Sequence, residues 1–199
     1  MGRPLCASAG TVCRKVFEST FLVLHSPKMI QTPFGTVTLR PITDADLPFL
    51  LQLYGTVRAD ELAQVPWTDD QKAAFVLQQF EAQHAWWQEH YTNARFDLVL
   101  VAGKPAGRLY VDVWEREVRI VDIAMLPEFR GRGLGTLLLR RVFREGDAAG
   151  KPVSIHVEVF NPARRLYDRL GFVQKGTHGD VYLLMERPVG GAAPAEASA

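Results

Sequence analysis

The hydrophobic positions along this chain follow two periods, and the changes between them divide it into strands and helices. Alternating or β-branched stretches predict strands, and they lie at residues 36–40, 96–102, 106–113, 118–125, 153–160, 172–175 and 181–186. Repeats at helical spacing predict helices, at residues 43–55, 68–93, 134–150 and 162–170. The order β-α-α-β-β-β-α-β-α-β-β predicts an α/β fold with a mixed α+β sheet, in which an antiparallel meander precedes a βαβ unit.

Capping residues and glycines support the predicted helix ends. Thr43 with Asp46, and Thr68 with Gln71, have the spacing of capping boxes, which satisfy the free backbone N–H groups at a helix start. A glycine follows three of the helices, where a left-handed residue can end them: Gly55, Gly150 and Gly171.

The length of 199 residues predicts one domain with two tails. Residues 1–28 show neither period, so we expect a disordered tail or a mis-assigned start. Residues 189–199 are mostly small, so we expect a second disordered tail. The domain itself then spans residues 29–188.

Composition and charge exclude several classes of protein. The formal net charge of +1 at pH 7 gives no whole-protein field that would gather nucleic acid or an anionic membrane. No apolar run is long enough to cross a bilayer. Both cysteines, Cys6 and Cys13, lie in the N-terminal tail, and the spacing of histidines and carboxylates predicts no metal site. We expect a cytoplasmic protein without nucleic-acid or membrane partners, and the choice between monomer and homodimer is open.

The stretch at 121–136 carries the clearest chemical signal. A strand ends, a glycine-rich turn follows, and a helix begins inside that turn, so free backbone N–H groups and the positive helix end converge on one point. Three glycines let a ligand approach the backbone and two arginines add positive charge: Gly131, Gly133, Gly135, Arg130 and Arg132. These features predict a phosphate site, and the alternative is an ordinary helix start with flexible glycines.

The spacing of this turn separates it from two common phosphate sites. A dinucleotide fingerprint would place a third glycine where Thr136 stands, and the Gly-Lys-Ser/Thr of a P-loop is absent. The pattern that matches is Arg/Gln-x-x-Gly-x-Gly/Ala, filled by Arg130, Gly133 and Gly135. With this pattern the chain resembles the GNAT superfamily of acyl-CoA N-acetyltransferases.

The rest of the domain supports this resemblance, which covers about residues 30–188. In GNAT proteins the phosphate turn is followed by a helix, a strand, an Asn, and a short helix with a Tyr ahead of a Gly-Phe pair. The same order occurs here, with Asn161, Tyr167 and Gly171-Phe172 at the matching places. Asn161 also precedes Pro162, so the alternative role of a helix N-cap is open for it.

The resemblance implies where the cofactor lies. Acetyl-CoA would occupy a V-shaped opening between the strand that ends at Met125 and the strand that starts at Val153. Its pantetheine arm would pair with the backbone of the first strand, and its pyrophosphate would lie on the glycine-rich turn. The cofactor-binding residues implied in this way are Ile123, Ala124, Met125, Arg130, Gly131, Arg132, Gly133, Leu134, Gly135, Thr136 and Asn161.

The resemblance also implies catalytic residues. Tyr167 matches the usual general acid of the family, which protonates the CoA thiolate when an amine attacks the thioester directly, although a packing role is the alternative. The glutamate that serves some members as base aligns with Arg119, which cannot accept a proton. His156 matches a histidine of some protein N-terminal acetyltransferases, and an imidazole is suited to relay a proton through water. Glu158 lies on the same strand face and could orient or replace His156.

The acceptor is not identified by the sequence. Aromatic and histidine side chains near the end of the second helix form either a wall of the acceptor site or part of the core: His84, Trp86, Trp87, His90 and Tyr91. Asp112 and Asp122 could meet a cationic acceptor, but solvated acids at strand ends are the simpler interpretation. The resemblance implies an acetyl-CoA-dependent N-acetyltransferase acting on a primary amine of a small molecule or protein. The alternative is a catalytically silent domain that binds acyl-CoA as a sensor or scaffold.

Overall fold

A single mixed sheet with helices on both faces forms the protein, described by a computed structural model over residues 29–179 and 181–191. Its strands are β1 (Ile30–Thr32), β2 (Gly35–Pro41), β3 (Arg95–Val101), β4 (Lys104–Val113), β5 (Val118–Met125), β6 (Val153–Glu158), β7 (Val173–His178) and β8 (Tyr182–Arg187). Its helices are α1 (Leu47–Ala63), α2 (Asp69–His90), α3 (Leu134–Ala149) and α4 (Arg164–Arg169), with short 3-10 turns η1 (Asp44–Asp46) and η2 (Pro127–Phe129).

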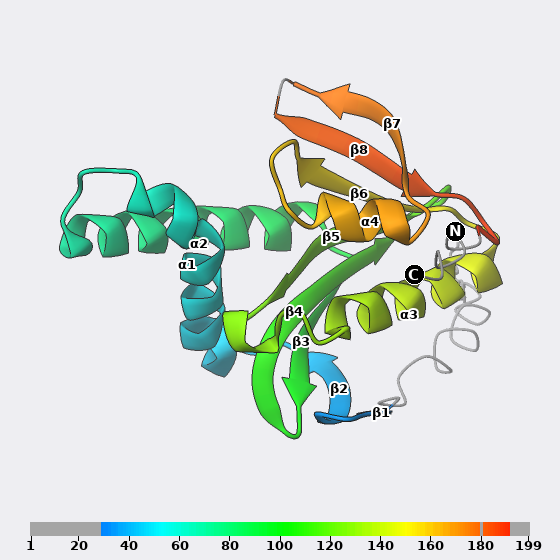
Figure 1. The fold of residues 1–199 in the computed structure, drawn as a ribbon, viewed down its shortest axis with the longest axis horizontal. Coiled ribbons are helices and arrows are strands. Elements are labelled where there is room, and N and C mark those ends of the chain that lie inside the picture. Colours follow the sequence, from blue (N-terminus) through cyan, green and yellow to red (C-terminus); the bar gives the residue numbers. More distant parts are fainter. Residues whose placement is uncertain (1–28, 180, 192–199) are drawn as a thin grey trace, which may run out of the picture.

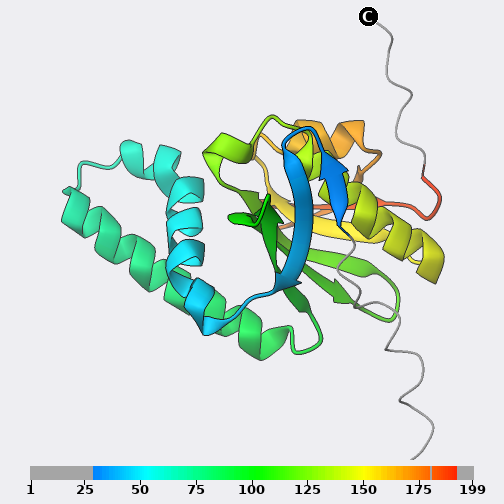
Figure 2. The ribbon, with the colours of Figure 1, turned by 90° about the horizontal axis from the view of Figure 1, so that it is seen from below.

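The strands lie in the order β1-β2-β3-β4-β5-β6-β8-β7, and β5 with β6 is the parallel pair among otherwise antiparallel neighbours. Helices α1 and α2 cover one face of the sheet, and α3 and α4 cover the other (Figures 1 and 2). The far ends of α1 and α2 project together beyond the edge of the sheet (Figure 1). The predicted α/β fold with a mixed sheet is therefore confirmed.

Two hydrophobic clusters hold these layers together. The larger lies between the sheet and α3, where Leu138 and Val142 pack in one cluster with Val118 and Ile120 of β5. The smaller lies under α1 and α2 and includes Tyr54, whose ring centroid is 6.0 Å from that of Phe80. Because both faces of the central strands are covered, the polar side chains that reach these faces must be paired or functional.

The sequence predictions hold for most elements and fail at three: β1, the end of α1 and the end of β7. Strand β7 continues to His178 instead of ending at residue 175, because its pairing with β8 continues past a register shift after Gln174. Strand β1 was not predicted, because three residues are too short to show an alternating pattern. Gly55 does not end α1, which continues to Ala63; its backbone has no positive φ, and the burial of Leu62 extends the apolar face of the helix. By contrast, Gly150 and Gly171 do follow the ends of α3 and α4, with φ of 64° and 86°.

The predicted tails are only partly within the described residues. The predictions for residues 1–28 and 192–199 lie outside them. At the predicted start of the C-terminal tail, residues 190 and 191 contact the domain: the Gly190 N–H donates to Asp147 Oδ1 at 2.8 Å, and the Arg187 guanidinium donates to the Gly191 carbonyl. In the described ranges, no helix is long and apolar enough to cross a membrane, and no group of His, Cys, Asp and Glu side chains could hold a metal ion.

Candidate active site

Strands β5 and β6 separate partway along their length, as the resemblance implies. They pair only at Val118 with Val153, Arg119 with Ser154 and Ile120 with Ile155. Strand β5 continues to Met125 and β6 continues to Glu158 without further pairing between them. The divergence leaves an edge of β5 unpaired, which is where a ligand can add its own hydrogen bonds to the backbone.

The free backbone groups of this edge belong to Ile123 and Met125. The Leu126 N–H donates to the Ala106 carbonyl at 2.9 Å, and alternation along the antiparallel pair then directs the backbone of Ala124 toward β4 as well. The backbone groups of Ile123 and Met125 consequently face the opening. One of them is engaged, because Arg130 Nε donates to the Met125 carbonyl at 2.8 Å.

The turn before α3 has the geometry of an anion site. Gly131 and Gly133 have φ of 70° and 74°, and a Cβ built on either glycine would meet no atom within 4 Å. The first helical backbone bond runs from the Leu137 N–H to the Gly133 carbonyl. Within the described chain, the N–H groups of residues 131–136 have no backbone acceptor, so they are free for a ligand at the positive end of α3.

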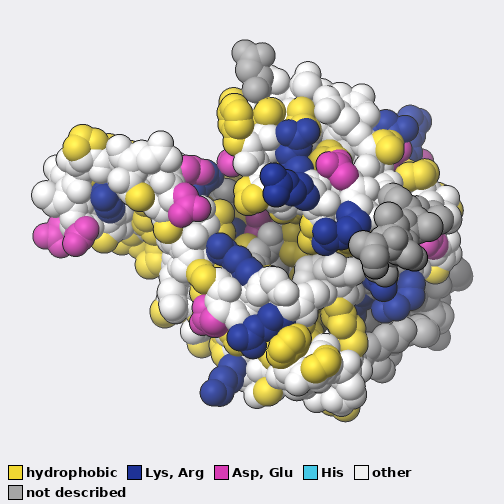
Figure 3. All heavy atoms as spheres, viewed as in Figure 1, with side chains coloured by type: hydrophobic (Ala, Val, Ile, Leu, Met, Phe, Trp, Pro, Cys, Tyr) yellow, Lys and Arg dark blue, Asp and Glu magenta, His cyan; other side chains and the backbone are white. Residues whose placement is uncertain are grey.

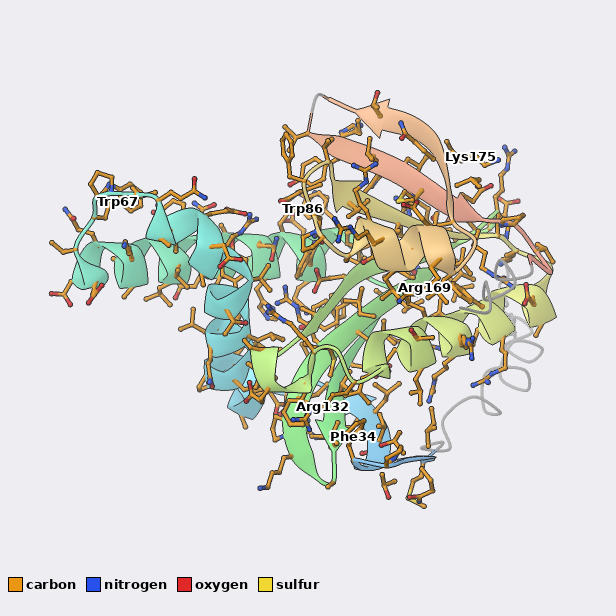
Figure 4. The ribbon with its side chains drawn as sticks, viewed as in Figure 1. Phe34, Trp67, Trp86, Arg132, Arg169 and Lys175 are labelled. Atoms are coloured by element: carbon orange, nitrogen blue, oxygen red, sulfur yellow. The ribbon has the colours of Figure 1, made fainter. Side chains whose placement is uncertain are left out.

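The two arginines of the turn contact the protein as well as adding charge. Arg132 lies 5.1 Å from the ring centroid of Phe34, and the two side chains lie side by side in Figure 4. Arg130 Nη2 reaches Thr56 Oγ1 on α1 at 3.4 Å. Lys and Arg side chains gather on this face of the molecule, around α4 and the turn (Figure 3). Leu134 is buried, so its contribution to a ligand is its backbone N–H.

Asn161 has the local role that its place before Pro162 predicts. Its Oδ1 accepts a hydrogen bond from the Ala163 N–H at 2.9 Å, and its carbonyl accepts from the Arg164 N–H at 3.1 Å. These bonds fix the chain between β6 and α4 at the edge of the opening. The amide nitrogen of the Asn161 side chain makes no hydrogen bond within the described residues, so a contact with the cofactor is compatible with the capping role.

Tyr167 lies in α4, on the opposite side of the sheet from α1 and α2. Its side chain is buried, and its ring centroid is 5.5 Å from that of Phe172. Burial raises the pKa of the Tyr167 hydroxyl, and the negative charge of Asp122 raises it further. The hydroxyl therefore stays protonated throughout the neutral range and can act only as a proton donor there.

His156 stands at the point of strand divergence and is held by Arg119. Arg119 Nη1 lies 2.8 Å from His156 Nδ1, and its Nε and Nη2 donate to Glu117 Oε1 at 3.0 and 2.6 Å. Partial burial lowers the pKa of His156, and the positive charge of Arg119 lowers it further. A neutral His156 that accepts from Arg119 through Nδ1 carries its proton on Nε2.

Helix α1 crosses the mouth of the opening because it does not end at Gly55. Thr56 meets Arg130, which lies beside the end of β5, and Arg58 Nη1 lies 3.4 Å from Glu158 Oε1 at the end of β6. Arg58 also donates to Glu61 Oε1 at 3.0 Å. An acceptor that enters from this side must pass these side chains.

The predicted aromatic wall divides into a core part and a surface part. Trp87 is buried and packs at right angles to Tyr110, with ring centroids 5.6 Å apart. Trp86 is about half exposed and stacks on His90, with centroids 4.3 Å apart. Tyr91 stacks on Trp114 at 6.3 Å. Trp87 thus supports the core, whereas the exposed rings remain candidates for contact with an acceptor.

Asp122 is the residue of this site that the sequence interpretation undervalued. The pairing of β4 and β5 shifts between Tyr110 and Val111, which pair with Asp122 and Ile120, so Val121 is an extra residue in β5. Asp122 therefore lies at the divergence of the strands and faces α2 together with Tyr110. No sequence pattern marks a bulge of this kind, so the sequence favours the simpler interpretation of Asp122 as a solvated acid at a strand end.

Comparison with known proteins identifies the family to which this chain belongs. The sequence model of the Acetyltransferase (GNAT) family matches residues 57–172, and the chain belongs to this family. Acetyl-CoA is therefore the acyl donor that family membership implies. An uncharacterized N-acetyltransferase of Methanocaldococcus jannaschii is 26% identical over 171 residues, which cover 81% of this chain and 72% of the relative.

Solved structures with low sequence identity share the fold. The PaiA N-acetyltransferase of Thermoplasma acidophilum, in complex with coenzyme A, has a TM-score of 0.59 at 13% identity and covers 76% of this chain and 98% of its own. The ribosomal-protein-S18-alanine N-acetyltransferase of Escherichia coli has a TM-score of 0.54 at 19% identity and covers 82% of this chain and 99% of its own.

Proposed function

We propose that this protein transfers the acetyl group of acetyl-CoA to a primary amine by direct attack, without an acyl-enzyme. The observation that carries the proposal is the divergence of β5 and β6, with the free N–H groups of residues 131–136 at one side and a buried Tyr167 hydroxyl close enough to Asp122 of β5 for that charge to raise its pKa. In this arrangement the turn binds the pyrophosphate, the edge of β5 binds the pantetheine arm, and the thioester comes to Tyr167. Tyr167 then donates its proton to the departing thiolate.

The amine must lose a proton before it attacks. Deprotonating a lysine-like amine at pH 7 costs about 4.6 kcal/mol, whereas an α-amine costs only about 1 kcal/mol. We propose that His156 assists through water, and that the help matters most for an amine of high pKa. In the neutral state described above, the imidazole orients that water through Nε2–H; taking up a proton itself would require it to release Arg119.

A pH profile tests the role of His156. Replacing His156 with Ala should lower kcat/KM most near pH 7, with partial recovery at pH 9, because more of the acceptor amine is already neutral there. The pKa of His156 is lowered, so the wild-type imidazole stays neutral over this range and adds no titration of its own. A defect of equal size at every pH would instead assign His156 to holding Arg119.

The amine acceptor and the reaction are tested together by a screen for free CoA. The protein is incubated with acetyl-CoA and a panel of diamines, amino-acid amides, peptides with free N-termini and aminoglycosides, and released thiol and acetylated product are measured. Amine-dependent release with matching product supports the proposal. Tight binding of acetyl-CoA without release for any acceptor supports the silent sensor or scaffold instead. The cytoplasmic location stays a prediction.

A further inference from the structure

Asp122 is presented to the acceptor side of the opening by the bulge in β5. Residues 119 and 122 are an odd number apart, so in a regular strand they would lie on opposite faces. The extra residue at Val121 brings them to the same face, since their partners Asp112 and Tyr110 are two residues apart on β4. Tyr110 packs on Trp87 of α2, which identifies this face as the one that α1 and α2 cover.

A rigid support fixes the position of the Asp122 carboxylate. Arg108 Nε donates to Asp122 Oδ2 at 2.6 Å, and the Arg108 side chain is only 3% exposed. The guanidinium of Arg108 lies 5.0 Å from the ring centroid of Trp87 and 5.3 Å from that of Tyr110, so it is held between them. Asp122 itself is 26% exposed, and in the described chain its Oδ1 accepts no hydrogen bond. One carboxylate oxygen is therefore anchored and the other is available.

Within the described residues, no hydrogen bond or ion pair engages the Oδ1 atom of Asp122, and two arginines on the same side of the sheet are paired with other groups. Arg119 is engaged by Glu117 and His156, and Arg58 is engaged by Glu61 and Glu158. On the other side of the opening, the group that faces Asp122 is Tyr167, which is neutral. A positively charged ligand group is the missing partner for the free oxygen of Asp122, and the opening between Asp122 and Tyr167 is where the reacting amine must lie.

We propose that Asp122 binds the ammonium group of the acceptor beside the thioester and so selects cationic amines; this deepens the proposed acetyl transfer and rests on it. The ammonium donates to Oδ1 in a charge-assisted hydrogen bond. After one proton leaves to water, the neutral amine remains bound to Asp122 through N–H, with its lone pair toward the thioester carbonyl. The C–N bond forms and the C–S bond breaks, and the thiolate takes the proton of Tyr167. The nitrogen loses its second proton through water to the Tyr167 phenolate, which leaves the acetylated amine, free CoA and the starting form of Tyr167.

Binding to the CoA-saturated protein tests this role without turnover, with n-butylamine as the probe and n-butanol as its neutral counterpart. We expect Asp122→Asn to weaken n-butylamine binding about 10-fold or more, since a charge-assisted bond is lost, and to leave n-butanol and acetyl-CoA binding unchanged. Asp168→Asn is the matched control, because Asp168 is an exposed neighbour of Tyr167 on α4, and it should behave like wild type. Equal n-butylamine affinity in both variants would overturn the proposal.

A second measurement uses the wild-type protein, so its result does not depend on whether Asp122→Asn folds. In a nuclear magnetic resonance titration, the carboxyl carbon signal of Asp122 should shift when n-butylamine is added and should not shift with n-butanol. An unmoved signal would overturn the proposal even if Asp122→Asn failed to fold. Kinetics separate the two proposals: acetyl transfer with an unchanged amine KM in Asp122→Asn rejects the role of Asp122 alone, whereas binding at Asp122 with no turnover of any amine rejects the transferase activity alone.

Discussion

Replacing Tyr167 with Phe should lower kcat by about 100-fold or more, the usual contribution of a positioned general acid. The substitution removes the hydroxyl that protonates the thiolate and keeps the ring that packs on Phe172. No hydrogen bond contributes to the environment of this hydroxyl within the described residues, so its loss should change the free energy of unfolding little. Steady-state kinetics with a saturating amine, together with thermal unfolding, measure both quantities.

Tyr110 provides the matched control for this variant. It is a fully buried tyrosine of the neighbouring strand, and its hydroxyl also has no hydrogen-bond partner within the described residues. Tyr110→Phe removes only the hydroxyl and keeps the ring that packs on Trp87 and Arg108, so it should keep kcat within about twofold of wild type. Normal turnover of Tyr167→Phe would reassign the general acid, and equal losses in the two variants would attribute both to packing.

Replacing Gly133 with Val should weaken acetyl-CoA binding by about 100-fold, far more than it destabilises the fold. The φ of 74° at Gly133 is left-handed, so a side chain strains the backbone by about 1–2 kcal/mol. A Cβ at this position meets no protein atom within 4 Å, so the valine side chain would occupy the space through which the pyrophosphate approaches the N–H groups of the turn. Calorimetry of acetyl-CoA binding and thermal unfolding separate the two effects.

Gly150→Val isolates the backbone strain from the ligand effect. Gly150 has a φ of 64°, and a Cβ there also meets no atom within 4 Å, but it lies at the C-terminal end of α3, opposite to the phosphate turn. It should lose a similar amount of stability and retain the affinity for acetyl-CoA. An affinity for acetyl-CoA that is unchanged in Gly133→Val would mean that the cofactor lies elsewhere.

The elements of this fold were largely predictable because they rest on local signals. The Thr68 capping box forms as expected, with the Gln71 N–H donating to Thr68 Oγ1 at 3.3 Å and the Thr68 N–H donating to Gln71 Oε1 at 2.9 Å. The glycine-rich turn was equally visible, since its function depends on consecutive residues. The predicted end of α1 at Gly55 is wrong because this glycine has no positive φ. Within a helix such a glycine only lowers helix stability, and the packing of Leu62 outweighs that loss.

The candidate site was predictable only in part, because it depends on contacts between distant residues. The hydrogen bond of Arg119 to His156 joins β5 to β6, and it changes the imidazole from a free base into a group with a fixed orientation. The position of Asp122 depends on a bulge that shows itself only in the pairing with β4. Likewise, the closure of the opening by Arg58 and Glu158 joins residues 100 positions apart in the chain.

The central claim is that acetyl-CoA binds where β5 and β6 diverge, with its phosphates on the turn before α3. A backbone amide titration with acetyl-CoA, followed by nuclear magnetic resonance, tests it most directly. The account predicts the largest shifts at the N–H groups of residues 131–136 and at Ile123 and Met125, with small shifts at the turn between β7 and β8. Saturable shifts confined to other parts of the sheet, or none at 131–136, would contradict it.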